Sequence, residues 1–503
     1  MLELQNVTLR LRGSGRTLID DFSFTLQKGD RAALIGEEGN GKSTLLQFIY
    51  DRRLPESWCE CSGTVLCRGK MAWLPQMLPR ELYDVSLAEF FDGTAWYDHT
   101  ALLLRLGTAP ERLFSEQKLG TLSGGERVRF QLLRLLMDDP DVLLLDEPAN
   151  DLDIPTLEWL ETFLNTARQP VLFISHDETL IENTANVIIH IEQLLHKTQT
   201  RITLTRAPYR EYLRRRADLF EHQNQMAFKE RSDHEKQMDR WRQIYQRVEH
   251  EQNSLTRQDP HGGRLLKKKM RSVLSTGRRL EREAEDFTPF AHREDAILTA
   301  FDGDISLPSG KTVLAFGPES VRVGERILAE NAALTVTGPE KIGIIGANGV
   351  GKSTLLAALW AALKDRRDVT AAWMPQDYAA VLPYGASPLE FLERSGGKEE
   401  SVRIHNRLAS IRFTYEEMHG PIRALSGGQQ AKLLFLDMVL RRADVLLLDE
   451  PTRNFSPLSA PVVRAALASF GGAIISVSHD RKYLSEVCTA VYELTPEGLV
   501  KIR

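Results

Sequence analysis

The chain contains one sequence unit twice, and this duplication constrains its fold more than any other feature. Two pairs of stretches match: LIGEEGNGKSTLL (34–46) with IIGANGVGKSTLL (344–356), and TLSGGERVRFQLLRLLMDDPDVLLLDEP (121–148) with ALSGGQQAKLLFLDMVLRRADVLLLDEP (424–451). The spacing is 310 residues from Gly36 to Gly346 and 303 residues from Ser123 to Ser426. Motifs that recur in the same order at a nearly constant spacing indicate a duplicated domain.

Each copy alternates predicted strands with predicted helices. RAALIG (31–36) and KIGIIG (341–346) are apolar runs that lead into glycine-rich loops, and VLLLD occurs in both copies as a fully apolar run. Short apolar runs of this kind are typical of strands buried on both faces of a parallel sheet. We therefore expect two α/β domains, each built around a mainly parallel sheet.

The overall composition predicts a globular protein of about three units, because a typical unit has roughly 150 residues and the chain has 503. It has no run of about 18 apolar residues and no apolar core near its start, so we expect neither a membrane span nor export, and a cytoplasmic location. Four cysteines indicate a reducing compartment. Cys59, Cys61 and Cys67 lack the Cys-x-x-Cys pairs of a zinc ribbon, which favours small residues in a turn and strand over a metal site.

A different kind of segment separates the copies. We expect residues 1–205 to form the first domain, 206–292 a helical hairpin and 293–503 the second domain. The hairpin stretch is rich in Arg, Lys, Glu and Gln, with apolar residues three and four positions apart. RQDPHGG (257–263) interrupts the pattern, which resumes with LLKKKM. A first arm of roughly 45 residues would be about 65–70 Å long.

The far end of this hairpin is strongly basic. Between Arg257 and Arg282 there are nine cations and two anions, a balance of +7 in a chain whose net charge is −5. Screening acts over about 8 Å in physiological salt, so a polyanion would respond to this local charge. The alternative is a solvated coiled coil with a charged face. We expect RNA binding by the following residues: Arg257, His261, Arg264, Lys267, Lys268, Lys269 and Arg271. His261 could equally be a solvated turn residue.

The glycine-rich loops have the spacing Gly-x-x-x-x-Gly-Lys-Ser and follow a strand, which predicts phosphate-binding loops whose N–H groups surround phosphate oxygens. The loops supply these candidates: Gly36, Gly39, Gly41, Lys42, Ser43 and Thr44 in the first copy, and Gly346, Gly349, Gly351, Lys352, Ser353 and Thr354 in the second. The lysines would pair with the β- and γ-phosphates and the serines would ligate Mg²⁺.

Each VLLLDE strand ends in two adjacent carboxylates. Asp146 and Asp449 suit a magnesium shell, and Glu147 and Glu450 would orient and polarise the attacking water. A helix cap is the alternative, but the repetition in one context argues against it.

LSGGE (122–126) and LSGGQ (425–429), just ahead of those strands, resemble the signature of ATP-binding cassette proteins. Gln76, Gln376, His176 and His479 stand where that family has its Q-loop and switch histidine. Two cassettes joined by a long charged hairpin, with APYREYLRRRA (207–217) at its start, resemble the ABC-F family over essentially the whole chain.

The resemblance implies that the two copies close head to tail around two ATP molecules, within one monomeric chain. Site one would combine Lys42, Ser43, Gln76, Asp146, Glu147 and His176 with Ser426, Gly427 and Gly428 of the second copy. Site two would combine Lys352, Ser353, Gln376, Asp449, Glu450 and His479 with Ser123, Gly124 and Gly125 of the first. The glutamines would join the serines and aspartates as Mg²⁺ ligands.

The chain departs from the family pattern in two places. Asn454-Phe455-Ser456-Pro457 stands in place of the usual Asn-His-Leu-Asp, whereas the first copy keeps Asn150-Asp151-Leu152-Asp153. Since this segment reaches the opposite nucleotide, site one would lose a carboxylate and the two sites would turn over unequally; a tolerated loop change is the alternative. The stretches ahead of the loops lack an aromatic residue for stacking adenine, so Arg12 or Arg322 would substitute and the preference for ATP over GTP stays open.

ABC-F proteins bind the ribosomal tRNA exit site, and their hairpin reaches toward the peptidyl-tRNA and the peptidyl-transferase centre. By resemblance we expect 70S ribosome binding, with contacts to 23S rRNA and P-site tRNA and no membrane partner. The Gln-to-signature distances are 47 and 50 residues, and 24 residues follow His479, so we expect neither an extra arm nor a coiled-coil extension. This favours an antibiotic-resistance factor acting by ribosome protection. The alternatives are a housekeeping translation factor that relieves stalls, the ATPase subunit of a membrane transporter and, remotely, a DNA-repair protein.

Overall fold

The computed structural model describes residues 1–94, 96–105, 107–150, 152–194, 199–253, 260–285, 287–290, 306–394 and 396–503. The chain divides into two compact units, one formed by residues 1–209 with 294–503 and the other by residues 210–293. We call the first unit the body and the second the hairpin. Within the described ranges, no helix is both long and apolar enough to cross a membrane.

The first copy is built on a six-stranded sheet in which all neighbours are parallel except the last pair. Its strands, in order across the sheet, are β5 (Met71–Leu74), β6 (Val142–Asp146), β7 (Val171–Ile174), β3 (Arg31–Ile35), β8 (Val187–Leu194) and β9 (Gln199–Thr205). An antiparallel sheet lies beside it, with β2 (Thr17–Leu26), β1 (Leu2–Leu11) and β4 (Cys59–Cys67) in that order. Every residue of β6 and β7 is buried, as the apolar runs predicted.

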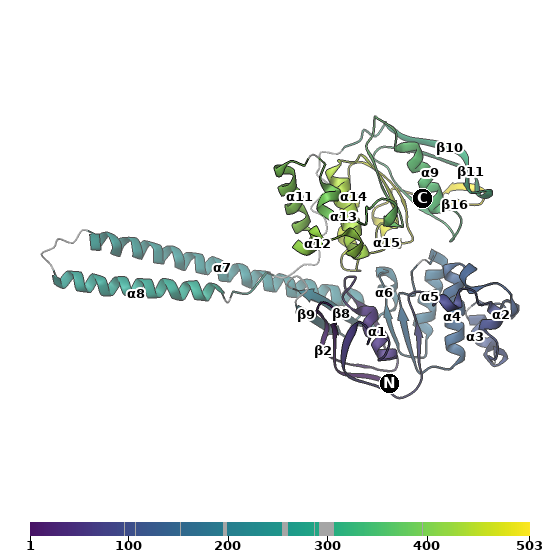
Figure 1. The fold of residues 1–503 in the computed structure, drawn as a ribbon, viewed down its shortest axis with the longest axis horizontal. Helices are drawn as coiled ribbons and strands as arrows, with labels where there is room; N and C mark the ends of the chain where they lie inside the picture. Colours follow the sequence, from purple (N-terminus) through teal and green to yellow (C-terminus); the bar gives the residue numbers. More distant parts are fainter. Residues whose placement is uncertain are drawn as a thin grey trace. The chain divides into compact units, whose positions relative to one another are not determined.

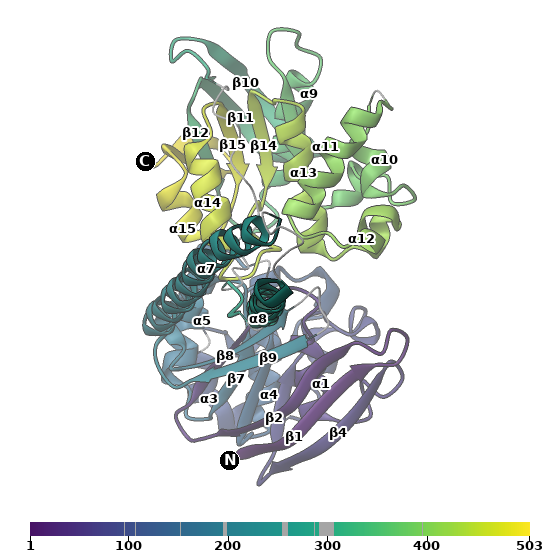
Figure 2. The same ribbon diagram turned by 90° about the vertical axis from the view of Figure 1, so that its left-hand side faces the viewer.

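The second copy repeats this architecture (Figures 1 and 2). Its six-stranded sheet runs β13 (Ala371–Met374), β14 (Val445–Asp449), β15 (Ala473–Val477), β12 (Lys341–Ile345), β16 (Ala490–Thr495) and β17 (Gly498–Lys501). The accompanying antiparallel pair is β10 (Thr312–Val323) with β11 (Arg326–Thr337). The expected α/β class with a mainly parallel sheet in each copy is therefore confirmed.

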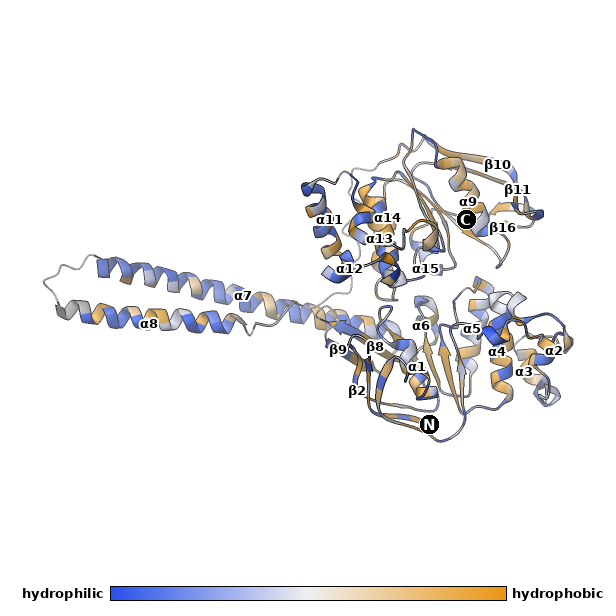
Figure 3. Ribbon diagram, in the orientation of Figure 1, coloured by the Kyte–Doolittle hydropathy of each residue, from blue (hydrophilic) through white to orange (hydrophobic). Residues whose placement is uncertain are grey.

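Helices cover these sheets, and their apolar sides meet the orange strands in Figure 3. The first copy has α1 (Lys42–Tyr50), α2 (Leu87–Phe90), α3 (Thr100–Arg105), α4 (Gly124–Met137), α5 (Ile154–Thr166) and α6 (Glu178–Thr184), with short 3₁₀ turns at Arg80–Leu82, Trp96–His99, Pro110–Phe114 and Leu119–Thr121. The second has α9 (Lys352–Leu363), α10 (Pro388–Leu392), α11 (Lys398–Ser410), α12 (Tyr415–His419), α13 (Gly427–Leu440), α14 (Ala460–Ser469) and α15 (Arg481–Glu486), with 3₁₀ turns at Tyr378–Ala380 and Ile422–Ala424.

The hairpin consists of two helices that lie side by side in both views (Figures 1 and 2), α7 (Tyr209–Asn253) and α8 (Pro260–Glu285). The 45 residues of α7 match the expected first arm. The expected start of the second helix was wrong, because α8 begins at Pro260 and not after Gly263. Proline is favoured at the first position of a helix, where its missing N–H is not needed.

The two helices of the hairpin pack closely against each other around Trp241. The Trp241 indole Nε1 on α7 donates a 2.7 Å hydrogen bond to the Val273 carbonyl on α8. A Cβ at Gly277 would lie only 2.8 Å from Cζ2 of the Trp241 ring, so this position needs glycine. The helices are otherwise mostly hydrophilic (Figure 3).

Candidate nucleotide sites

Both glycine-rich loops have the geometry of phosphate-binding loops. Gly41 and Gly351, which precede α1 and α9, have φ values of 89° and 102°, in the left-handed region that favours glycine. The Lys42 ammonium donates to the carbonyls of Gly36 at 2.8 Å and Glu37 at 3.0 Å. Lys352 makes the same two bonds in the second loop, at 2.8 and 3.0 Å. Burial lowers the pKa of both lysines, and the carboxylates around each lysine oppose the shift.

The acidic strand ends lie next to these loops. The Ser43 hydroxyl donates a 3.0 Å hydrogen bond to Asp146 at the end of β6. Burial raises the pKa of Asp146 to about 7, that of Glu147 to about 7 and that of Glu450 to about 8. Hydroxyl and carboxylate oxygens are the hard ligands that Mg²⁺ prefers, and a divalent cation would favour the ionised carboxylates again. The donor set in each copy therefore fits magnesium.

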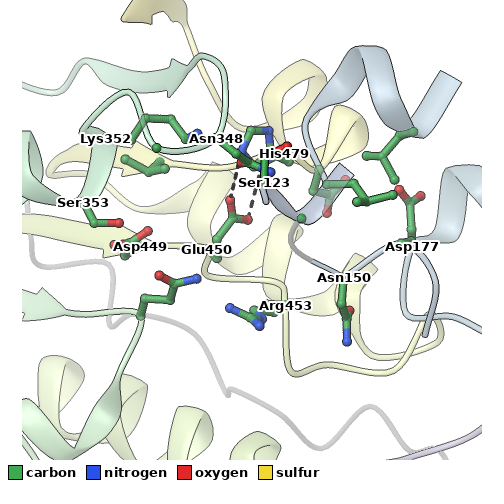
Figure 4. A pocket seen from close by; sticks show the side chains of 18 of the residues that line it. Ser123, Asn150, Asp177, Asn348, Lys352, Ser353, Asp449, Glu450, Arg453 and His479 are labelled. Carbon is green, nitrogen blue, oxygen red and sulfur yellow. Dashed lines mark hydrogen bonds and ion pairs between the residues drawn. The ribbon is translucent and has the colours of Figure 1, made fainter. Parts of the chain in front are cut away.

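Each switch histidine contacts the glutamate of its own copy. The His176 N–H donates to Glu147 Oε2 at 3.2 Å, and its ring Nε2 lies 3.2 Å from Glu147 Oε1. His479 makes the corresponding contacts with Glu450 at 3.3 and 3.9 Å (Figure 4). Burial lowers the pKa of His176 to about 3 and that of His479 to about 4, so both rings are neutral near pH 7. The backbone N–H of each histidine can therefore orient the glutamate, and the neutral ring adds no charge beside it.

Most of the residues expected at site two line one cavity of about 750 Å³ (Figure 4). Its lining includes Gly349, Gly351, Lys352, Ser353, Thr354, Gln376, Asp449, Glu450 and His479 of the second copy, with Ser123 and Gly124 of the first. Ser123 caps α4 in a capping box with Glu126, and Ser123 and Gly124 at this helix start both line the cavity. The cavity is thus composite, with the phosphate loop from one copy and the signature from the other.

Three of the expected residues do not line this cavity. Gly125 packs against α5, since a Cβ there would lie 2.8 Å from Thr156 Oγ1. Gln76 is an exposed side chain just after β5. Gly346 begins the second loop at a φ of 148°, and a Cβ there would lie 2.6 Å from the Leu494 carbonyl oxygen.

At site one the second copy contacts the first through different groups. The Gly428 N–H in the first turn of α13 donates a 2.7 Å hydrogen bond to Glu38 of the first phosphate loop. Lys432, one turn further along α13, lies 3.6 Å from Glu37. The sequence reasoning did not select these glutamates. The only signal for them was the difference between GEEGNGKS and GANGVGKS at matching positions.

The segment after the second acidic pair also reaches site one, because His176 Nδ1 donates a 3.0 Å hydrogen bond to the Phe455 carbonyl. Its expected register was wrong by one residue. Asp153 caps α5 by accepting from the Thr156 N–H at 3.2 Å, and Ser456 accepts from the Ser459 N–H at the same distance. Ser456 is therefore the counterpart of Asp153. Asp151 lies outside the described residues.

This register locates the missing carboxylate. Burial lowers the pKa of Lys352 and of His479 at site two, and the Asp153 carboxylate opposes both shifts. At the corresponding position facing site one, Ser456 offers a neutral hydroxyl. The prediction of unequal turnover remains a prediction.

Within the described residues, neither arginine proposed for base stacking is held at a phosphate loop by a hydrogen bond or an ion pair. The Arg12 guanidinium donates to the Glu56 carbonyl at 3.1 Å and lies 3.9 Å from Glu60, while Arg322 is an exposed residue of β10. Arg16, which the sequence reasoning missed, donates to the Gly39 carbonyl of the first phosphate loop at 3.1 Å.

Five of the residues expected to bind RNA lie on α8 with exposed side chains: Arg264, Lys267, Lys268, Lys269 and Arg271. Lys269 has a carboxylate nearby, Glu251 at 3.7 Å. Arg257 lies outside the described residues, and so does the side chain of His261.

Comparison with known proteins identifies the class. The family model described as ABC transporter matches residues 19–150 and 329–453, together just over half of the chain. The Probable ATP-binding protein YheS of Escherichia coli (strain K12) is 28% identical over 536 residues, covering 96% of this chain and 77% of the relative. The Ribosome protection protein VmlR of Bacillus subtilis (strain 168) is 27% identical, covering 100% of this chain and 88% of its own.

A plant relative and a solved structure are also similar to this chain over nearly its whole length. The ABC transporter F family member 5 of Arabidopsis thaliana is 25% identical, covering 98% of this chain and 75% of the relative. An archaeal ribosome recycling factor, solved in complex with a ribosomal stalk protein, covers 99% of this chain and 90% of its own at a TM-score of 0.59 and 16% identity, which shows a shared fold.

Two copies of one α/β fold, each with a phosphate loop facing the other copy's signature, define an ATP-binding cassette protein. The chain belongs to the ABC transporter family, and within it to the ABC-F proteins, and it is an ATPase.

Proposed function

We propose that the chain is an ATP-dependent ribosome-binding protein that acts at the tRNA exit site of the 70S ribosome. Residues 206–292 form the domain that reaches toward P-site tRNA, 23S rRNA and the peptidyl-transferase centre, between cassettes 1–205 and 293–503. The proposed outcome is antibiotic resistance by ribosome protection, in the cytoplasm. The name of the Bacillus subtilis relative, which aligns with 100% of this chain, supports this outcome.

The observation that carries the proposal is the composite cavity at site two. Because Ser123 and Lys352 come from different copies and line one cavity, a nucleotide between them would stabilise their apposition. The exposed cations of α8 supply the group that would contact RNA phosphates. ATP binding and RNA binding would thus belong to different parts of one chain.

The chain's own residues divide the work of hydrolysis. Lys42 and Lys352 would hold phosphate oxygens, and Ser43, Gln76 and Asp146, with Ser353, Gln376 and Asp449, would hold Mg²⁺. When bound, the ion neutralises phosphate charge. Glu147 and Glu450 would accept the proton of the attacking water, each held in place by the histidine beside it.

A pelleting assay tests ribosome binding. The Glu147→Gln, Glu450→Gln double variant with ATP should co-sediment with 70S ribosomes through sucrose, because closure without hydrolysis is not reversed. The Lys42→Ala, Lys352→Ala variant should not co-sediment. Failure of the glutamine variant to sediment at low salt would contradict the proposal.

The contribution of the basic helix is tested with a charge-matched pair. Replacing Lys267, Lys268 and Lys269 with Gln should weaken sedimentation and its salt dependence. The control replaces the exposed Lys28, Lys364 and Lys398 of the body with Gln, which removes the same charge. Equal effects would mean that net charge, and not α8, drives binding.

A housekeeping role in relieving stalls is the second candidate, since it would use the same composite ATP site and the same basic helix. Expression in a susceptible host separates the two. If the protein confers resistance, the wild type should raise the inhibitory concentrations of drugs that bind near the peptidyl-transferase centre. The double glutamine variant should not raise them. A change in stalling without a change in susceptibility would favour the housekeeping role.

A further inference from the structure

We propose that Glu38 governs nucleotide entry to site one. Its carboxylate occupies the signature of the second copy in place of the γ-phosphate, so ATP binds site one only by displacing it and binds there more weakly than at site two. This inference rests on the composite ATP sites proposed above.

The first argument is the position of the carboxylate. Gly428 lies in the first turn of α13, a 14-residue helix, where backbone N–H groups have no partner within the helix. Its N–H donates to Glu38 Oε2 at 2.7 Å, the length of a charge-assisted hydrogen bond. This N–H is the group that a sandwiched nucleotide would use for its γ-phosphate. The carboxylate and the phosphate therefore compete for one donor.

The second argument is how closely the acidic pair fits. A Cβ at Gly427 would lie 3.1 Å from Glu38 Oε2 and 3.3 Å from Asn454 Cγ, so the carboxylate packs directly on the backbone of the signature. Lys432, which is only 9% exposed, lies 3.6 Å from Glu37. A buried cation and a helix start thus both face carboxylates of the first phosphate loop.

The third argument comes from the chain's own second copy. Asn348 and Ala347 stand where the first loop has Glu38 and Glu37. Asn348 lines the site-two cavity together with Ser123 of the opposite signature (Figure 4). The same position therefore faces the opposite signature in both copies, with an anion at site one and a neutral amide at site two.

Two consequences follow from the charge. Without nucleotide, Glu38 satisfies the signature of the second copy and ties it to the first loop. With ATP present, the displaced carboxylate stays beside a polyanion, and like charges at a few ångströms repel. Site two would therefore bind ATP first, and site one would fill only at a higher ATP concentration.

Calorimetric titration of the full chain tests this inference, with Mg²⁺ and the non-hydrolysable analogue AMP-PNP or with ADP. The Lys352→Ala background isolates site one, and the Lys42→Ala background isolates site two. In the first background, Glu38→Asn should tighten AMP-PNP binding by about tenfold, or roughly 1.4 kcal/mol. ADP binding should change far less, because ADP has no γ-phosphate to compete for the Gly428 N–H.

Two further variants sharpen the result. In the Lys42→Ala background, Asn348→Glu should weaken AMP-PNP binding at site two by about tenfold. Glu37→Ala removes the same charge one residue away but does not free the Gly428 N–H, so its effect on AMP-PNP should be smaller than that of Glu38→Asn. Thermal unfolding of each variant checks that it folds.

The outcomes separate the inference from the proposal on which it rests. If the intact chain binds two nucleotides and each lysine background binds one, the two sites stand. Glu38→Asn without effect, or with equal gains for AMP-PNP and ADP, then overturns the role of Glu38 alone. If a lysine substitution leaves the number of bound nucleotides unchanged, the site assignment and the inference both fall.

Discussion

Removing the Arg464 side chain should loosen the contact between the two copies more than any exposed ion pair could. Arg464 on α14 donates to Glu178 on α6 at 2.8 Å, and the two side chains are only 3% and 7% exposed. Arg464 also donates to Glu486 at 2.6 Å. Lys482 of the second copy binds the other oxygen of Glu178 at 2.9 Å. One buried carboxylate of the first copy is thus held by two cations of the second.

The expected magnitude follows from this burial. Arg464→Met keeps the length of the side chain but leaves Glu178 with Lys482 alone. Removing one partner of a buried ion pair destabilises a protein by about 3–5 kcal/mol. Because Lys482 remains, we expect the lower end, about 3 kcal/mol. The matched control is Arg134→Met, which breaks a pair with Asp138 inside one copy whose side chains are 33% and 64% exposed, and it should lose no more than about 0.5 kcal/mol.

A double-mutant cycle measures the free energy of the Arg464–Glu178 interaction. It compares the urea unfolding of the wild type, Arg464→Met, Glu178→Gln and the double variant. Because the two residues are in direct contact, we expect a coupling free energy of about 1–3 kcal/mol. ATPase activity should fall in parallel, since both composite sites need the copies in register. Additive single losses, or an Arg464→Met loss no larger than that of Arg134→Met, would refute the reasoning.

Three further predictions concern single side chains. Burial raises the pKa of Glu450 to about 8 from 4.5, so the stability that its protonated form gives the nucleotide-free protein is present below pH 4.5 and is lost as the pH rises to about 8. Glu450→Gln should therefore raise the melting temperature more at pH 8.5 than at pH 6. A shift of the melting temperature that does not depend on pH would contradict this. Glu147→Gln and Glu450→Gln should leave different residual rates in single-turnover hydrolysis, whereas equal rates would remove the predicted inequality of the sites. Gly277→Ala should destabilise the hairpin by about 1–3 kcal/mol, because the new methyl group clashes with Trp241 and the gain in helix propensity is smaller than that cost. Ser275→Ala, at an exposed position of the same helix, should not destabilise it. Hydrogen exchange of the α8 amides measures the effect of each variant.

The sequence predicted those parts of the sites that depend on short stretches of chain. A glycine at a fixed position before Lys42 or Lys352 predicts a loop because the required backbone angles are local. The apolar strands that end in Asp146 and Asp449 predict where the acids emerge for the same reason. The duplication then doubled each signal, which is why the fold class and its mainly parallel sheets could be predicted.

The rest depends on contacts between residues far apart in the chain. Glu38 and Gly428 are 390 positions apart, and no local pattern indicates that they meet. The register around Ser456 was misjudged because the letters there no longer resemble the first copy. The spacing of 303 residues that separates Ser123 from Ser426 also separates Asp153 from Ser456. The hydrogen bonds of Asp153 with Thr156 and of Ser456 with Ser459 agree with that register.

The two departures from symmetry together suggest that a negative charge has moved from one copy to the other. At site two, Asp153 of the opposite copy opposes the burial shifts of Lys352 and His479. At site one Ser456 has no charge, and Glu38 is among the groups that oppose the burial shifts of Lys42 and His176.

A double variant tests this exchange. Ser456→Asp alone would add a second anion to site one, in addition to Glu38, and should weaken AMP-PNP binding there, measured in the Lys352→Ala background. Combined with Glu38→Asn, the same aspartate would restore the arrangement of site two, and its effect should shrink or reverse. An equal loss from Ser456→Asp in both backgrounds would show that the two positions act independently, and the exchange of charge would then be a coincidence of two unrelated substitutions.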